Sequence, residues 1–355
     1  MRRIIVLITP PSTFLLEERM FINLGILKVA AEMEGAGWHV VHLDLSGYKN
    51  FAKAAADFAA TTPAVIFGLT ATSPQLPAAT KITEAIRRVR KDAKIILGGP
   101  HATLVYAAKK LEAKQNRPGR AHAAANRLEA IFDVLVAGDG EDAIFDACEA
   151  CMTGSTNFID ADGHLGGGGK DSPLFLTDAR LEASAYPARH LVDLESYDFK
   201  IDNIRASSII GQLGCPFDCG FCAGRNSAML RKTRTRSSEH IIAEMVHMQK
   251  AYGIQGFMFY DDELNLDNTT FLDLLSKIAK VQRDNGWTWR LRGNVKSQLF
   301  AKNPEQGKAM YEAGFRTLLV GFESGSPRIL HNIKKMATQE HNTKCLDIAR
   351  RRYPE

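Results

Sequence analysis

The sequence has few cysteines, no long apolar run and little net charge, and each shortage removes a class of protein. Six cysteines in 355 residues are far too few for a disulfide-stabilised secreted scaffold, so we expect reduced thiols and a cytoplasmic protein. No apolar run approaches the roughly 20 residues of a membrane-spanning helix, so no membrane is expected as a partner. The N-terminal apolar run stops at Thr9-Pro10-Pro11, which is too soon for a signal-peptide core.

The net charge of +5 is mild and requires neither nucleic acid nor a lipid surface as a partner. A run of five cations does lie between Arg225 and Arg236, and it could meet an anionic substrate or RNA. No aromatic residue alternates with these cations, so base stacking is not expected. We interpret the run as a solvated loop, and nucleic acid is not an expected partner.

The composition is that of an ordinary globular protein, with 45% hydrophobic and 24% charged residues, and the length suits two domains. Apolar runs separated by helical patterns predict five strands in the first 150 residues. These runs are residues 2–8, 39–45, 63–70, 93–100 and 131–141. Strands joined by helices of this length predict a doubly wound parallel sheet, that is, a Rossmann-like α/β domain over residues 1–150.

Small and polar residues follow the predicted strands, and ligands of such sheets bind beyond the carboxyl ends of the strands. Each glycine there could simply make a tight turn, but several such loops on one edge predict a ligand crevice. The candidate binding residues are Thr70, Thr72, Ser73, Gly98, Gly99, His101, Gly138, Gly140 and Glu141.

Residues 151–204 are rich in turn formers and are predicted to be a linker, with a flexible tip at the glycine run 166–169. Residues 205–355 then show four strand–helix units. Their strands are expected within residues 206–214, 255–264, 287–295 and 315–326. Such units can curl into a TIM-like (β/α) barrel whose active site lies at the carboxyl ends of the strands. Four units make only a partial barrel, so the chain could be a fragment, half of a split enzyme, or a truncated and inactive relative.

The first of these strands leads into GCPFDCGFC, which places Cys215, Cys219 and Cys222 at a C-x3-C-x2-C spacing. A structural zinc ion would need a fourth ligand, and Cys148 or Cys151 could supply it, although both read as small buried residues near the end of a helix. A [4Fe–4S] cluster held by three thiolates is the other interpretation. It leaves one iron without a protein ligand, and an open coordination position marks a catalytic metal.

The cysteine spacing, with Phe221 before the third cysteine and a preceding strand, resembles the signature of radical S-adenosylmethionine (SAM) enzymes. The resemblance implies that Cys215, Cys219 and Cys222 hold a [4Fe–4S] cluster whose open iron binds the methionine part of SAM. The reduced cluster then cleaves SAM to a 5′-deoxyadenosyl radical that abstracts hydrogen. It further implies SAM contacts at Asp261, Asp262, Glu263, Arg292 and Glu323, which lie in FYDDEL, in WRLRGN and in GFESGS.

The first domain resembles the N-terminal domain of the cobalamin-binding subgroup of these enzymes, in NLGILKVAAEMEGAGWHVVHLDL, LGGPHAT and DVLVAGDGEDAI. The resemblance implies cobalamin as a further cofactor. One departure is that the motif Asp-x-His-x-x-Gly, whose histidine ligates cobalt in many cobalamin domains, is not found. His101 follows two glycines and is interpreted as a loop residue near the nucleotide tail.

The resemblance therefore implies a cobalamin-dependent radical SAM enzyme, with methyl transfer to an unactivated carbon as the leading interpretation. A radical cyclase or rearrangement enzyme on the same scaffold, and a degenerate corrinoid-binding protein without catalysis, are the alternatives. The implied partners are a small-molecule substrate, a reductant such as flavodoxin or ferredoxin, and a second chain that completes the barrel.

Overall fold

The structure, a computed structural model, describes residues 3–164 and 170–352, and its contacts divide the chain into two compact units. Unit 1 comprises residues 1–176, 184–197 and 226–229. Unit 2 comprises residues 177–183, 198–225 and 230–355. The predicted flexible tip at 166–169 lies outside the described residues.

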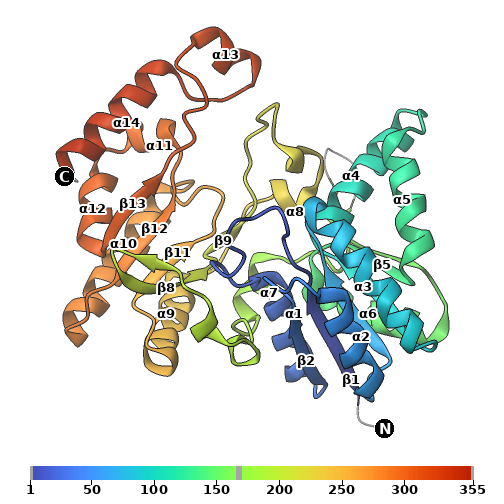
Figure 1. Cartoon of the computed structure of the whole chain (residues 1–355). Helices are drawn as coiled ribbons and strands as arrows, with labels where there is room; N and C mark the ends of the chain where they lie inside the picture. Colours follow the sequence, from blue (N-terminus) through green and yellow to red (C-terminus); the bar gives the residue numbers. More distant parts are fainter. Residues whose placement is uncertain (1–2, 165–169, 353–355) are drawn as a thin grey trace. The chain divides into compact units, whose positions relative to one another are not determined.

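Unit 1 is built on a six-stranded, wholly parallel sheet with the strand order β2-β1-β3-β4-β5-β6 (Figure 1). The strands are β1 (Ile4–Thr9), β2 (His39–Asp44), β3 (Ile66–Thr70), β4 (Lys94–Gly98), β5 (Val134–Gly138) and β6 (Phe158–Ala161). The five strands predicted from the apolar runs are confirmed. Strand β6 was not predicted, because it has four residues and lies in a segment read as linker.

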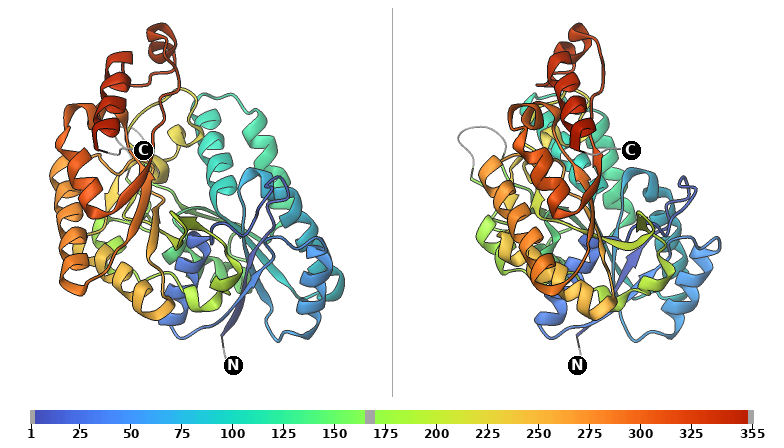
Figure 2. Two further views of the ribbon diagram at one scale, coloured as in Figure 1. Left: turned by 60° about the vertical axis from the view of Figure 1, so that its left-hand side comes forward. Right: turned by 90° about the vertical axis from the view of Figure 1, so that its left-hand side faces the viewer.

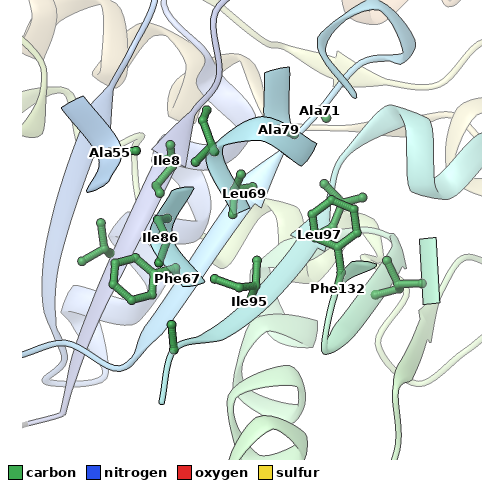
Figure 3. Close-up of a cluster of buried hydrophobic side chains, with 14 of the residues drawn as sticks. Ile8, Ala55, Phe67, Leu69, Ala71, Ala79, Ile86, Ile95, Leu97 and Phe132 are labelled. Atoms are coloured by element: carbon green, nitrogen blue, oxygen red, sulfur yellow. The ribbon is translucent and has the colours of Figure 1, made fainter. Parts of the chain in front are cut away.

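Helices cover both faces of this sheet, which confirms the doubly wound fold. They are α1 (Leu24–Gly35), α2 (Phe51–Thr61), α3 (Leu76–Val89), α4 (Pro100–Lys114), α5 (Arg120–Ile131) and α6 (Gly140–Thr153). One face packs on α2 to α5, where strand residues such as Phe67 and Ile95 meet Ile86 and Phe132 (Figure 3). Helices α1 and α6 contact each other on the other face. Burial on both faces explains the uninterrupted apolar runs of the strands.

The chain changes direction along the sheet at β1. Strand β2 pairs with one edge of β1 and β3 with the other. The connections leaving β1 and β3 therefore diverge, which opens a crevice at the carboxyl ends of these two strands. This topology places the loop after β3, with Thr70, Thr72 and Ser73, at that crevice, and the loop after the neighbouring strand β4 beside it.

The short segment 226–229 belongs to unit 1 through the buried carboxylate of Asp162, which is 5% exposed. Its Oδ1 accepts hydrogen bonds from the backbone N–H of Met229 at 2.7 Å and from the hydroxyl of Ser227 at 3.1 Å. A buried carboxylate is costly unless it is hydrogen-bonded, so these contacts hold the segment in place.

Unit 2 contains a five-stranded sheet with the order β13-β12-β11-β8-β7, in which the four strands from β8 to β13 are parallel. The strands are β7 (Lys200–Ile201), β8 (Ile204–Ile209), β11 (Gly256–Phe259), β12 (Arg290–Asn294) and β13 (Phe315–Leu319). Strands β7 and β8 form an antiparallel hairpin whose turn residues, Asp202 and Asn203, have φ values of 49° and 61°. Such a turn favours short polar residues, which tolerate positive φ. A further pair, β9 (Gln212–Leu213) and β10 (Arg234–Thr235), brackets the cysteine loop.

The helices of unit 2 pack along one face of its sheet in both views of Figure 2. They include α9 (Ser238–Tyr252), α10 (Asn268–Asn285), α12 (Glu305–Ala313) and α14 (Gln339–Arg352). Short helices α7 (Asp178–Ala183), α8 (Ala228–Arg231), α11 (Ser297–Lys302) and α13 (Pro327–Asn332) complete the described α-helices, with α8 divided between the two units. The alternation of parallel strands and helices confirms the predicted partial barrel. No helix in the described part of the chain is long and apolar enough to cross a bilayer.

Candidate active site

The three cysteines of the motif lie at different depths in one loop after β8. Cys219 is 8% exposed, Cys215 is half-buried and Cys222 is exposed, next to the exposed ring of Phe221. The backbone N–H of Cys215 donates to the carbonyl of Leu230 at 3.0 Å, and that of Cys222 donates to the carbonyl of Cys219 at 3.0 Å. The loop therefore offers three thiols from a fixed backbone.

A second segment holds the middle of this loop. The N–H of Gly220 donates to the carbonyl of Ile333 at 2.7 Å, and Asp218 accepts from Arg231 and from Lys334 at 3.2 Å each. Arg231 also donates to the carbonyl of Pro216 at 2.9 Å. The predicted solvated basic loop is therefore wrong in part, because Arg231 anchors the cysteine loop.

Two further members of that basic run lie inside the fold. Arg234 is 3% exposed and Arg236 is 6% exposed, and Arg236 forms an ion pair of 2.7 Å with Glu244. Buried cations are common only where they are paired. The run is thus structural in large part and does not make a continuous solvated surface.

Asp261 is committed to the backbone that leads into the loop. It is 2% exposed, and its two carboxylate oxygens accept from the N–H of Gly211 at 2.9 Å and of Gln212 at 2.7 Å. Burial raises the pKa of Asp261 to about 7, although the backbone donors oppose the shift. The geometry gives Asp261 a role in positioning the strand end from which the cysteine loop begins.

The other two acids of the FYDDEL stretch face a different set of charges. Burial raises the pKa of Glu263 to about 7, while Lys296 and Lys335 lower it and Asp262 and Glu323 raise it. Burial also raises the pKa of Asp262. Glu263 therefore interacts with four other charged groups, and the five together are called the charge cluster. Burial is the main cause that raises the pKa of Cys215, and Glu263 and Asp262 raise it further. The charge cluster therefore lies beside the cysteine loop.

Glu323 is held in a conformation that a side chain other than glycine seldom adopts. Its φ is 59°, and its Oε1 accepts a hydrogen bond of 3.1 Å from the ammonium of Lys335, which is 8% exposed. A Cβ at Gly321 would lie 2.7 Å from the same oxygen, so a larger residue there would displace the end of the Glu323 side chain. Backbone strain of about 1 kcal/mol or more concentrates at functional sites. This geometry is consistent with the ligand-binding role predicted for Glu323.

Arg292 lies on β12 and is half-buried. Its Nε is buried and has no hydrogen-bond partner among the described residues. Its charge lowers the pKa of Tyr260, although burial raises that pKa more. A shielded guanidinium without a carboxylate partner in the described chain is a suitable binding group for an anion.

Sequence reasoning missed Lys296 and Lys335, which complete the charge cluster. Lys296 follows β12 at the carboxyl end of the strand, which is where barrel enzymes place functional residues, and this position was the available signal. Lys335 carries no comparable signal, because it reads as one of two adjacent lysines in a polar stretch.

The cysteines also discriminate between the metal alternatives. Within residues 3–164 and 170–352, no three or more His, Cys, Asp or Glu side chains gather as the ligands of one ion would. Cys148 and Cys151 lie in α6, are 3% and 5% exposed, and burial raises the pKa of each to about 12. Neither cysteine gathers with other ligand side chains among the described residues, so the structure gives the zinc alternative no support. Thiols that are spread along one loop fit a cluster better, because each can bind a different iron.

In unit 1, the loops after β3 and β4 are bound to each other at the crevice. The N–H of Ala71 donates to the carbonyl of Gly98 at 3.2 Å, and the N–H of His101 donates to the carbonyl of Ala71 at 2.9 Å. Gly99 has a φ of 89°, and a Cβ there would lie 2.4 Å from the hydroxyl of Thr70. The tight contact therefore requires glycine.

Polar side chains line these joined loops. The hydroxyl of Ser73 hydrogen-bonds to Nδ1 of His101 at 2.9 Å. The backbone N–H of Thr72 donates to the side-chain oxygen of Gln75, and the side-chain amide of Gln75 donates to the carbonyl of Pro10 at 2.9 Å. Burial lowers the pKa of His101, so its imidazole is neutral at neutral pH. Hydroxyls and a neutral imidazole are donors and acceptors suited to a nucleotide tail, so this edge fits the predicted cofactor contacts.

The remaining predicted residues of unit 1 have structural partners. Gly138 has a φ of 101°, and a Cβ there would lie 2.2 Å from the carbonyl carbon of Ala161. Gly140 begins α6, and Glu141 is 8% exposed and forms an ion pair of 3.6 Å with Lys28 of α1. The structure therefore brings Thr70, Thr72, Ser73, Gly98, Gly99 and His101 together, while Glu141 faces a neighbouring helix.

Comparison with known proteins agrees with this division of the chain. The sequence model of the radical SAM superfamily matches residues 209–355, and the sequence model of the B12 binding domain matches residues 19–116. The first match covers the cysteine loop and the charge cluster. The second covers β2 to β4 and most of the loops at the crevice.

Individual relatives are distant and longer than this chain. An uncharacterized methyltransferase of Pyrococcus horikoshii, PH0819, is 25% identical over 81% of this chain and 57% of its own length. An anaerobic magnesium-protoporphyrin IX monomethyl ester cyclase of Rubrivivax gelatinosus is 22% identical over 80% of this chain and 48% of its own length. The chain thus spans about half the length of these curated relatives.

Among solved structures, the radical S-adenosylmethionine methyltransferase TsrM from Kitasatospora setae, with cobalamin and a [4Fe–4S] cluster bound, matches with a TM-score of 0.72. The match covers 99% of this chain and 65% of that protein at 18% identity, which establishes a common fold. The two family models match in the order of the two predicted domains, a B12 binding domain followed by a radical SAM domain, which supports the family that the sequence resembles.

Proposed function

We propose that the protein is a cobalamin-dependent radical SAM enzyme that transfers a methyl group to an unactivated carbon of a small-molecule substrate. The observation that carries the proposal is the loop of Cys215, Cys219 and Cys222, which offers three thiols beside a cluster of charged side chains. When bound, a [4Fe–4S] cluster and SAM supply reductive cleavage to a 5′-deoxyadenosyl radical, and cobalamin supplies a methyl carrier.

The chain's own residues then bind, orient and shield these groups. The three thiols hold the cluster, and Asp261 fixes the strand end from which their loop begins. Glu263 and Glu323 would accept hydrogen bonds from the amine and ribose of SAM, and Arg292 would pair with its carboxylate. Because an ammonium group stabilises an ionised carboxylate, binding of the SAM amine would lower the pKa of Glu263 from its value of about 7.

In unit 1, the joined loops after β3 and β4 would hold the nucleotide tail of cobalamin through Thr70, Thr72, Ser73 and His101. Hydrogen bonds within these loops support this role, because they fix the donors and acceptors before a ligand arrives.

We also propose a cytoplasmic location and an electron donor such as flavodoxin or ferredoxin. All six cysteines are free thiols, which suits a reducing compartment. The proposed reaction needs an electron from outside the chain, and the exposed Cys222 brings the proposed cluster near the protein surface.

A radical cyclase is the second candidate, and the similarity to the Rubrivivax gelatinosus cyclase favours it. The two candidates differ in what they make from SAM. Methyl transfer yields S-adenosylhomocysteine together with 5′-deoxyadenosine, because a second SAM restores the methyl group. A cyclase yields 5′-deoxyadenosine alone.

The test begins with metal content after anaerobic purification and reconstitution with iron, sulfide and hydroxocobalamin. About four irons and one cobalt per chain are expected, and zinc is expected to be absent from the cysteine loop. Cys219→Ala should lose the iron, whereas Cys151→Ala, a matched cysteine change in α6, should keep it. Zinc in place of iron would contradict the proposal, and cobalt without iron would indicate the non-catalytic corrinoid binder.

Addition of SAM and dithionite to the loaded protein then measures the two products. 5′-Deoxyadenosine together with S-adenosylhomocysteine supports methyl transfer. 5′-Deoxyadenosine alone supports the cyclase, and neither product would refute both enzymes.

A further inference from the structure

The side chain of Lys296 is buried beside the cysteine loop, and the proposed function gives it no task. Only 2% of its surface is exposed. Its backbone N–H donates to Oδ1 of Asn265 at 2.9 Å, and Nδ2 of Asn265 donates back to its carbonyl at 3.4 Å. Asn265 is itself 1% exposed, so the two residues fix the point from which the lysine side chain extends.

The ammonium of Lys296 ends on the cysteine loop. Its Nζ lies 3.9 Å from the centre of the ring of Phe217, which lies between Cys215 and Cys219 in the sequence. A cation on an aromatic face gains roughly 0.5–2 kcal/mol, which is less than the several kcal/mol that burial of a charge costs. The ring alone therefore does not account for this position.

Nearby charges are too distant to neutralise this ammonium directly. Burial lowers the pKa of Lys296, while Glu263, Cys219 and Cys215 raise it. No carboxylate oxygen among the described residues comes within ion-pair distance of its Nζ, whereas Lys335 pairs directly with Glu323. A buried cation without its own counter-ion calls for an anionic group, and the cysteine loop is the element that it contacts.

We propose that Lys296 is a positioning residue that raises the reduction potential of the iron–sulfur cluster held by Cys215, Cys219 and Cys222. The inference rests on the proposed function and adds to it a determinant of cluster reduction. Three thiolates leave the bound cluster negatively charged, and one-electron reduction adds a further negative charge. A fixed cation nearby stabilises the reduced state more than the oxidised state.

The expected effect of removing this charge is about a tenfold loss of reduced cluster at a fixed potential. For a one-electron couple, a tenfold change corresponds to 59 mV, so the midpoint potential should become more negative by about that amount. A purely structural lysine would give a different pattern. Met, which has nearly the same length, should then preserve the potential, and the wider Arg should disturb it.

The test is a potentiometric titration of reconstituted protein without SAM, in which electron paramagnetic resonance reports the reduced cluster. Lys296→Met and Lys296→Gln remove the charge, Lys296→Arg retains it, and Lys308→Met is the control. Lys308 lies in α12, its side chain is 64% exposed, and its loss changes the net charge equally. We expect a lower potential in the two neutral variants and an unchanged one in the Arg variant and the control.

Each outcome decides the question. Equal potentials in wild type and in the iron-loaded neutral variants would overturn the inference, as would a shift in Lys296→Arg equal to that of Lys296→Met. If neither Lys296→Met nor Lys296→Gln binds iron, iron binding by Lys296→Arg would support a required positive charge at this position. If Lys296→Arg fails to bind iron as well, the inference is overturned. Wild-type protein without iron would instead refute the proposed function.

Discussion

Replacement of Asp261 by asparagine tests how the fold positions the cysteine loop. Both carboxylate oxygens accept backbone N–H groups, from Gly211 and Gln212. An amide keeps one acceptor and turns an NH₂ group toward the other N–H. The lost hydrogen bond and the unsatisfied donor should cost about 1–3 kcal/mol of unfolding free energy at a pH where the carboxyl is protonated.

The pH dependence is the more specific consequence. The pKa of Asp261 is about 7 in the folded chain, against an ordinary value of 3.8, because of burial. Between these values the folded state retains a proton that the unfolded state has released, so stability falls as pH rises through this window. From pH 5 to pH 8 the two pKa values correspond to a loss of about 3 kcal/mol in wild type. Asp261→Asn does not titrate and lacks this loss.

The assay is urea unfolding followed by tryptophan fluorescence in a Trp38→Phe background. The remaining tryptophans, Trp287 and Trp289, both lie in unit 2, and Trp289 is fully buried. The signal therefore reports the unit that contains Asp261. In this background, the stability difference between the chain with Asp261 and the Asp261→Asn variant is measured at several pH values, so that other titrating groups cancel.

We expect the stability advantage of Asp261 to shrink by about 3 kcal/mol between pH 5 and pH 8. The control is Asp273→Asn on α10, where a hydrogen bond from Lys277 lowers the pKa of the carboxyl, so its difference should stay constant over this range. A constant difference for Asp261→Asn as well would show that this carboxyl ionises normally in the fold, and the argument from burial would fail.

Two further predictions concern unit 1 and the thiols. Gly138→Ala should destabilise unit 1 by about 3 kcal/mol or more, because its Cβ would lie 2.2 Å from a backbone atom. Gly154 has a φ of 69° and no atom within 4 Å of a Cβ placed there, so Gly154→Ala should cost only about 1 kcal/mol. Chemical denaturation followed by far-ultraviolet circular dichroism compares the two variants, and equal losses would contradict the steric argument. Limiting iodoacetamide should alkylate exposed Cys222 well before Cys148 and Cys151, whose pKa values are raised to about 12 by burial. Peptide mass spectrometry of the cluster-free protein measures the order, and early modification of the α6 pair would show that this helix opens.

The fold was predictable where strands are long and buried on both faces. Apolar runs such as residues 93–100 identify a strand without tertiary information, because a parallel sheet covered on both sides leaves no polar positions. Strand β6, at Phe158–Ala161, was not predictable, since four residues with two half-buried positions carry little pattern. The domain boundaries after residue 150 and before residue 205 remain predictions.

The site was predictable where chemistry requires a spacing, as in the cysteine motif. The sequence grouped Asp261 with Asp262 and Glu263 as equivalent acids. The structure gives them different partners, because successive residues at a strand end point in different directions. Lys296 could not be predicted as a buried charge, since its burial depends on packing against a loop about 80 residues earlier in the chain.

The contacts of Asp162 have a consequence for the order in which the protein can be built. The chain passes between the two units five times, and the last part of unit 1, residues 226–229, follows the third cysteine of the motif. During synthesis, the sheet of unit 1 emerges early, but the buried carboxylate of Asp162 accepts its hydrogen bonds from Ser227 and Met229 only after these residues are synthesised. The N-terminal unit can therefore reach its final stability only after the ribosome has translated the cysteine loop.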